Sequence, residues 1–118
     1  REGGSWGEPI QIEARDGDVD QRPFSTARLA IDEAGTVTAV WAQTDPPKAP
    51  DVVAVRHVFA NRFVPSAGWG EAVRLDQDGD SPSIRPVVAT SRAGTVAAWE
   101  RFVFEAQSSE LWVSAYEP

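Results

Sequence analysis

The chain repeats its own sequence once, and this duplication constrains the fold more than any other feature. Residues 5–12 (Ser-Trp-Gly-Glu-Pro-Ile-Gln-Ile) match residues 68–75 (Gly-Trp-Gly-Glu-Ala-Val-Arg-Leu). Four further matches keep the same order: 16–18 with 78–80, 22–23 with 85–86, 34–37 with 93–96, and Trp41 with Trp99. A recurrence every 58 to 63 residues or so indicates one structural unit used twice, with repeat 1 at 1–65 and repeat 2 at 66–118.

Each repeat predicts four short strands. Apolar and polar residues alternate from Ile10 to Ala14 and again around Val73 and Leu75, as in half-buried strands. Further strands are expected at 25–32, 36–42 and 52–59, and in the second copy at 86–91, 95–102 and 111–116. Four antiparallel strands per repeat, used twice, favour an all-β fold made of two β-propeller blades. A β-sandwich is the alternative, but it would not require duplicated turns.

The order of the predicted strands leaves the two repeats incomplete. The strand after Trp69 comes fourth in its blade, so its counterpart at Ile10 to Ala14 is separated from the three strands that follow it. The last strand, 111–116, then has an unpaired edge. We expect a neighbour to complete it, either an identical subunit in a cyclic homo-oligomer or adjacent blades of a longer chain. Three subunits would make six blades, so a trimer is favoured.

The repeated landmarks resemble those of bacterial sialidase-like propellers with Asp-box repeats. The resemblance rests on the Gly-Trp-Gly-Glu segment, the Arg-Pro pair and the Ala-Gly-Thr-Val segment followed by Trp. The Asp-box itself is echoed only by Asp32, Gly35 and Trp41, and Ser91 replaces the aspartate in the second copy. The resemblance implies a propeller that is secreted or displayed on a bacterial cell surface, and it implies no particular chemistry.

Composition narrows the classes of partner. The net charge of −7 argues against nucleic acid, because phosphate binding needs an excess of Lys and Arg. No apolar run approaches the roughly 18 residues of a membrane span, so no membrane insertion is expected. The chain has no cysteine, which excludes disulfides and thiolate metal sites.

Four residues are candidates for ligand binding: Trp6, Trp69, Arg22 and Arg85. Trp6 and Trp69 follow a small residue and precede a glycine, and indole rings in such turns can bind a carbohydrate or a protein. Arg22 and Arg85 precede the predicted inner strand, where guanidinium groups could hold a carboxylate. Packing between blades is the competing interpretation for these residues, and the favoured one for Trp41, Trp99 and the arginines.

The acidic turn at Asp76, Asp78 and Asp80 is a candidate calcium site. Its carboxylates alternate around Gly79, as oxygen ligands do in calcium loops. The late bidentate acid of an EF-hand is missing, so a solvated Asp-Gly turn is the favoured interpretation. Apart from this possible Ca²⁺, no cofactor is expected.

Catalysis is not expected from these residues alone. Tyr116 is the only tyrosine and His57 the only histidine, and no nucleophile motif or phosphate-binding loop is present. The sequence therefore predicts a non-catalytic binding or scaffold module, for a glycan or a protein, that assembles by strand exchange into a closed ring. A fragment of a sialidase-like glycosidase and a purely structural self-assembling unit are the alternatives.

Overall fold

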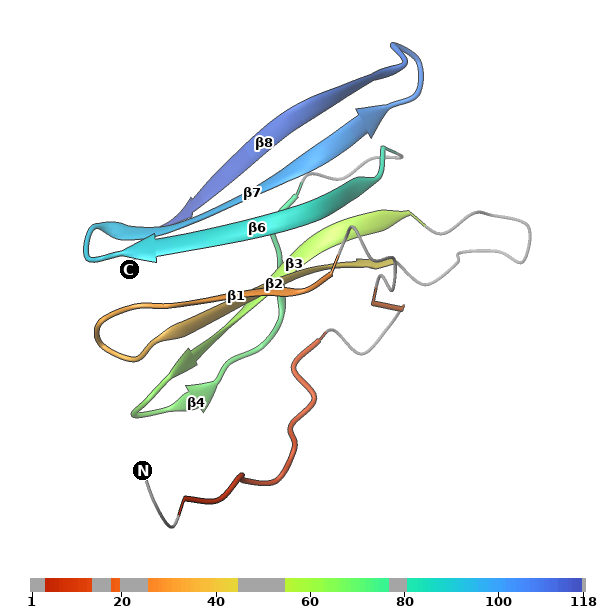
Figure 1. Cartoon of the computed structure of the whole chain (residues 1–118). Coiled ribbons are helices and arrows are strands. Elements are labelled where there is room, and N and C mark those ends of the chain that lie inside the picture. Colours follow the sequence, from red (N-terminus) through yellow and green to blue (C-terminus); the bar gives the residue numbers. More distant parts are fainter. Residues whose placement is uncertain (1–3, 14–17, 20–25, 45–54, 77–80, 118) are drawn as a thin grey trace.

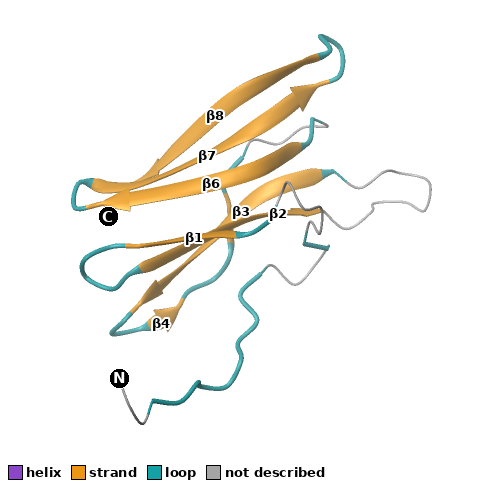
Figure 2. Cartoon of the chain, viewed as in Figure 1, coloured by secondary structure: helices purple, strands orange, loops and turns teal. Residues whose placement is uncertain are grey.

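The protein folds into two antiparallel sheets (Figure 1). The computed structural model describes residues 4–13, 18–19, 26–44, 55–76 and 81–117. Within these residues there is no helix (Figure 2), and so none that could cross a membrane. The all-β prediction is confirmed for this part of the chain, and none of its sheets closes on itself.

The first sheet contains five strands, and two of them share one edge. Its members are β1 (Arg28–Ile31), β2 (Val37–Thr44), β3 (Arg56–Val64), β4 (Gly68–Trp69) and β5 (Val73–Arg74). The order is β1-β2-β3, and β4 and β5 both pair with β3, so they act as one interrupted fourth strand. The Asn61 side chain supports the interruption, because its Nδ2 donates to the Gly70 carbonyl at 3.0 Å.

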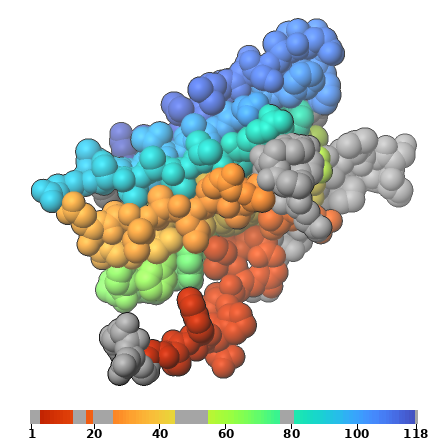
Figure 3. Space-filling view, viewed as in Figure 1, coloured from red at the N-terminus to blue at the C-terminus, as the bar shows by residue number. Residues whose placement is uncertain are grey.

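The second sheet has three strands within the described part of the chain. They are β6 (Ser83–Ser91), β7 (Gly94–Val103) and β8 (Ser108–Tyr116), paired in chain order. The predicted strand at Ile10 to Ala14 joins neither sheet: residues 10–13 form no strand, and Ala14 lies outside the described residues. The Asn61 Nδ2 donates to the Ile12 carbonyl at 3.0 Å, so this segment lies on the side of the first sheet away from the second (Figure 3).

Turn chemistry explains where the duplicated hairpins bend. In the β1–β2 turn, the Asp32 carboxylate accepts hydrogen bonds from the Ala34 and Thr36 amides, both at 2.9 Å. Gly35 has a φ of 85°, a conformation that costs a residue with a side chain about 1 kcal/mol or more. The second copy makes a tighter turn, with Ser91 opposite Gly94.

The core lies between the sheets. Val40 and Val58 of the first sheet pack against Ala97 and Trp99 of the second, and all four are buried. Four partly buried residues surround them: Ala60, Leu75, Val88 and Trp112. The core between the sheets is therefore apolar, and Trp99 is its largest buried side chain.

The strand registers reveal which faces of the two repeats are equivalent. Trp41 lies opposite Phe59 in the first sheet, and Trp99 lies opposite Trp112 in the second. With these pairs aligned, Phe63 corresponds to Tyr116, Val58 to Leu111 and Ala60 to Val113. We call the side with Trp41, Phe59, Phe63 and Trp69 the aromatic face of the first sheet, and the side with Val40, Val58 and Ala60 its aliphatic face.

Unlike faces meet in the core. The second sheet contributes its aromatic face, with Trp99 and Trp112, and the first sheet contributes its aliphatic face, with Val40 and Val58. The repeats are therefore stacked in one direction. They are not related by a two-fold axis, which would bring like faces together.

Candidate functional site

The outer edge of β8 is open to solvent and carries exposed apolar side chains. Among the described strands, β8 pairs with β7 alone. Its Leu111 side chain is 76% exposed and Val113 is 64% exposed. An edge strand with apolar side chains and unpaired backbone groups is a surface that other strands can join.

The aliphatic face of the second sheet extends this exposed surface over all three strands. It carries four large apolar side chains that are open to solvent: Val87, Val96, Leu111 and Val113. The corresponding positions in the first sheet include the fully buried Val58. The same position of the repeat is thus buried in one sheet and exposed in the other.

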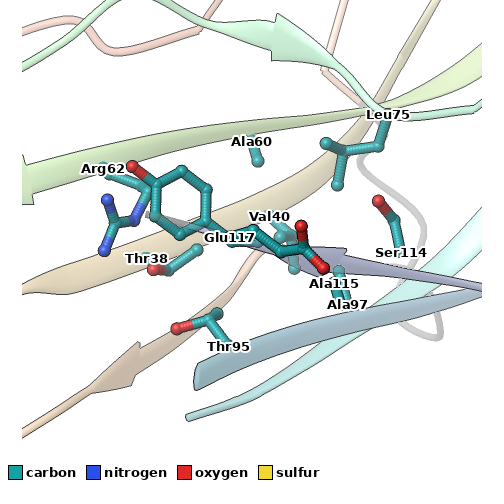
Figure 4. A pocket seen from close by; sticks show the side chains of 11 residues that line it. Thr38, Val40, Ala60, Arg62, Leu75, Thr95, Ala97, Ser114, Ala115 and Glu117 are labelled. Carbon is teal, nitrogen blue, oxygen red and sulfur yellow. The ribbon is translucent and has the colours of Figure 1, made fainter. Parts of the chain in front are cut away.

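A groove runs beside the β8 edge, between the two sheets. One cavity of about 180 Å³ is lined from both sheets, and it continues into a second of about 390 Å³ along β3, β4 and β5 (Figure 4 shows the first). The two share Ala60, Arg62, Leu75 and Tyr116. The Arg62 guanidinium lies 3.7 Å from the centre of the Tyr116 ring, a cation–π contact between the sheets.

The three predicted ligand-binding residues that the structure describes, Trp6, Trp69 and Arg85, are not gathered at one place. Trp6 is fully exposed on the N-terminal segment, whereas Trp69 packs against Phe63 with ring centres 5.7 Å apart. Arg85 has a positive φ of 53° at a bulge in β6 and donates to Glu100 at 2.8 Å. Arg22 lies outside the described residues. Binding of a glycan or a protein by these residues stays a prediction.

Asp76, the first residue of the predicted calcium turn, is buried in a network of protein groups. Its side chain is 2% exposed. One carboxylate oxygen is 2.8 Å from His57 Nδ1, and the other accepts from the Arg74 Nε at 3.2 Å and the Val58 amide at 3.3 Å. Burial acts to raise the pKa of Asp76, but the hydrogen bond from His57 and the charges of His57 and Arg74 outweigh it, so the pKa is lowered.

The described residues contain no group of three or more acidic, His or Cys side chains placed to hold a metal ion. Asp78 and Asp80 lie outside that part of the chain, so calcium binding stays a prediction. The role of Asp76 here is structural, because it ties the end of the fourth strand to β3.

Comparisons with known proteins add nothing to this geometry. No family model, curated protein or solved structure matches the chain. The functional argument therefore rests on the residues themselves.

The sequence patterns pointed to the open edge but missed the groove beside it. The sequence does not indicate that Arg62 and Tyr116 meet, although Arg62 lies in the first repeat and Tyr116 is the only tyrosine. The available signal was the alignment of Phe63 with Tyr116, which places an aromatic ring at the same point of both repeats. The β8 edge, the exposed aliphatic face and the groove can together bind another protein chain, by backbone hydrogen bonds and by apolar contacts.

Proposed function

We propose that this chain is a non-catalytic scaffold module, a pair of propeller blades whose sheets stack in one direction with those of further copies. The proposal rests on one observation: positions that are equivalent in the two repeats are buried in the first sheet and exposed in the second. Val58 and Ala60 are covered by the second sheet, and their counterparts Leu111 and Val113 are uncovered. A third sheet with an aromatic face fits this surface. Another copy of the chain carries such a face, which its own N-terminal segment overlies in the single chain.

The direction of the stack determines what kind of assembly follows. Because unlike faces meet, the contact between copies is heterologous, and such contacts give either closed rings or open filaments. A ring of three copies would contain six sheets, within the range of known propellers. Two to four copies would give four to eight sheets, the usual range, and we propose three copies in a closed ring.

We expect the purified chain to sediment as an oligomer of two or more copies at micromolar concentration, and Val87→Asp to shift it to the monomer. Val87 is half-exposed on β6, away from the β8 edge, so a carboxylate there would be buried without a partner in the stack. The association constant should fall by about a hundredfold or more, since an unpaired buried charge costs several kcal/mol. Analytical ultracentrifugation over a concentration series measures the change.

Phe104→Asp is the matched control. Phe104 is 58% exposed in the β7–β8 turn, outside the stacking surface, and it receives the same added charge. It should sediment like the unmodified chain. A strictly monomeric unmodified chain, or equal losses in both variants, would contradict the scaffold proposal.

A further inference from the structure

Among the described residues, no strand of the second sheet corresponds to the fourth strand of the first sheet. In the first sheet, β3 is completed on its outer edge by β4 and β5, with Phe63 opposite Trp69 and Ala60 opposite Val73. Two backbone bonds extend this pairing, from the Gly70 amide to the Arg62 carbonyl at 3.0 Å and from the Leu75 amide to the Val58 carbonyl at 2.8 Å. The corresponding carbonyls of β8 belong to Ala115 and Leu111, on its free edge.

The missing strand has a match in the sequence of this same chain. Residues 68–75, which form the fourth strand of the first sheet, match residues 5–12. Residues 68–75 pair with the sheet that precedes them in the chain and not with the sheet that follows. If residues 5–12 follow the same rule, they pair with a sheet other than the one formed by β1 to β5. The sheet of β6, β7 and β8 in a second copy of the chain can take this place.

Resting on the proposed stacking of copies, we propose that residues 5–12 of one copy add to the free edge of β8 of the next as an antiparallel fourth strand. The register follows from the first sheet, so that Trp6 lies opposite Tyr116 and Ile10 lies opposite Val113. The amides of Gly7 and Ile12 then donate to the carbonyls of Ala115 and Leu111, as those of Gly70 and Leu75 do to β3.

The side chains of the added strand fit the two exposed surfaces beside β8, the groove and the aliphatic face. Trp6 points to the aromatic side of the second sheet, beside Tyr116 and the groove of about 390 Å³. Its counterpart Trp69 likewise points to the aromatic side of the first sheet, where it packs on Phe63. Ile10 and Ile12 point to the opposite side and continue the exposed aliphatic face beside Val113 and Leu111. Trp6 and Ile10, both exposed in the single chain, gain apolar contacts in the exchanged strand.

Disulfide trapping between two separately prepared variants tests this register, since the native chain contains no cysteine. Chains with Ile10→Cys are mixed with chains carrying Val113→Cys, and oxidation is followed on non-reducing gels. Directly opposed residues have Cβ atoms about 4.5–5.5 Å apart, close enough to bond after a small shift. The matched control is Ser109→Cys, exposed on the same face of β8 but about 13 Å further along the strand.

We expect the mixed dimer of Ile10→Cys with Val113→Cys to form at least about tenfold faster than that with Ser109→Cys, because pairing gives the thiols a millimolar effective concentration. Equal rates for the two would overturn the register and the exchange. A chain carrying both Ile10→Cys and Val113→Cys that bonds within a monomer would also overturn exchange. If the unmodified chain sediments as an oligomer but no specific cross-link forms, strand exchange fails while the scaffold proposal stands.

Discussion

Replacing Trp99 by alanine is expected to lower the free energy of unfolding by about 3–5 kcal/mol, the usual cost of removing a large aromatic side chain from a core. Trp99 is 3% exposed and packs between the sheets against Val40 and Val58. The described strands of the two sheets share no backbone pairing, so the lost contacts weaken the apolar cluster that packs one sheet on the other. Urea unfolding followed by far-UV circular dichroism measures the change.

Phe104→Ala is the control for this loss. It also removes a large aromatic ring, but one that is exposed in the β7–β8 turn. Its effect should be within about 1 kcal/mol, as for most surface positions. A Trp99→Ala variant as stable as this control would show that the sheets are held together by something other than the described core.

The substitution Asp76→Ala should cost about 3–5 kcal/mol at neutral pH, because it removes a buried carboxylate that holds the His57 ring, the Arg74 guanidinium and the Val58 amide in one network. It would leave His57, which is 2% exposed, without its 2.8 Å partner. Glu33→Ala, which breaks an exposed pair with Arg92, should change the free energy of unfolding by about 0–1 kcal/mol.

Acid should remove the same stabilisation. The pKa of Asp76 is lower in the folded chain than its ordinary value of 3.8, so the folded state favours the ionised carboxylate. Its contribution is complete above pH 3.8 and is lost as the pH falls through the lower folded value. The difference in unfolding free energy between the unmodified chain and Asp76→Ala should therefore become smaller as the pH falls below 3.8. A constant difference between pH 6 and pH 2 would contradict the assignment.

The duplicated landmarks predicted the strands well where turns and side-chain alternation agree. The Asp32–Gly35 turn, the strand around Trp41 and the strands of the second sheet lie close to where the pattern puts them. The third strand was expected at 52–59 but runs Arg56–Val64, and 52–54 lie outside the described residues. Asn61 breaks the apolar pattern of this strand, yet it is buried because its amide donates to the Ile12 and Gly70 carbonyls.

Features that depend on side chains distant in the sequence could not be predicted. His57 and Asp76 are 19 residues apart and meet only because the fourth strand returns along β3. The contact of Arg62 with Tyr116 requires the two sheets to be stacked. The difference between Trp41 and Trp99 is of the same kind, since both occupy one repeat position but only Trp99 lies in the contact between the sheets.

The one-way stacking of the sheets gives each copy two unequal ends. One end would present the exposed aliphatic face to a neighbour, and the other would present the aromatic face that the N-terminal segment now overlies. A copy damaged at a single end can still attach through its intact end, but no further copy can attach after it. Such a copy acts as a chain terminator, so a small proportion mixed with intact protein would suppress closed rings out of proportion to its amount.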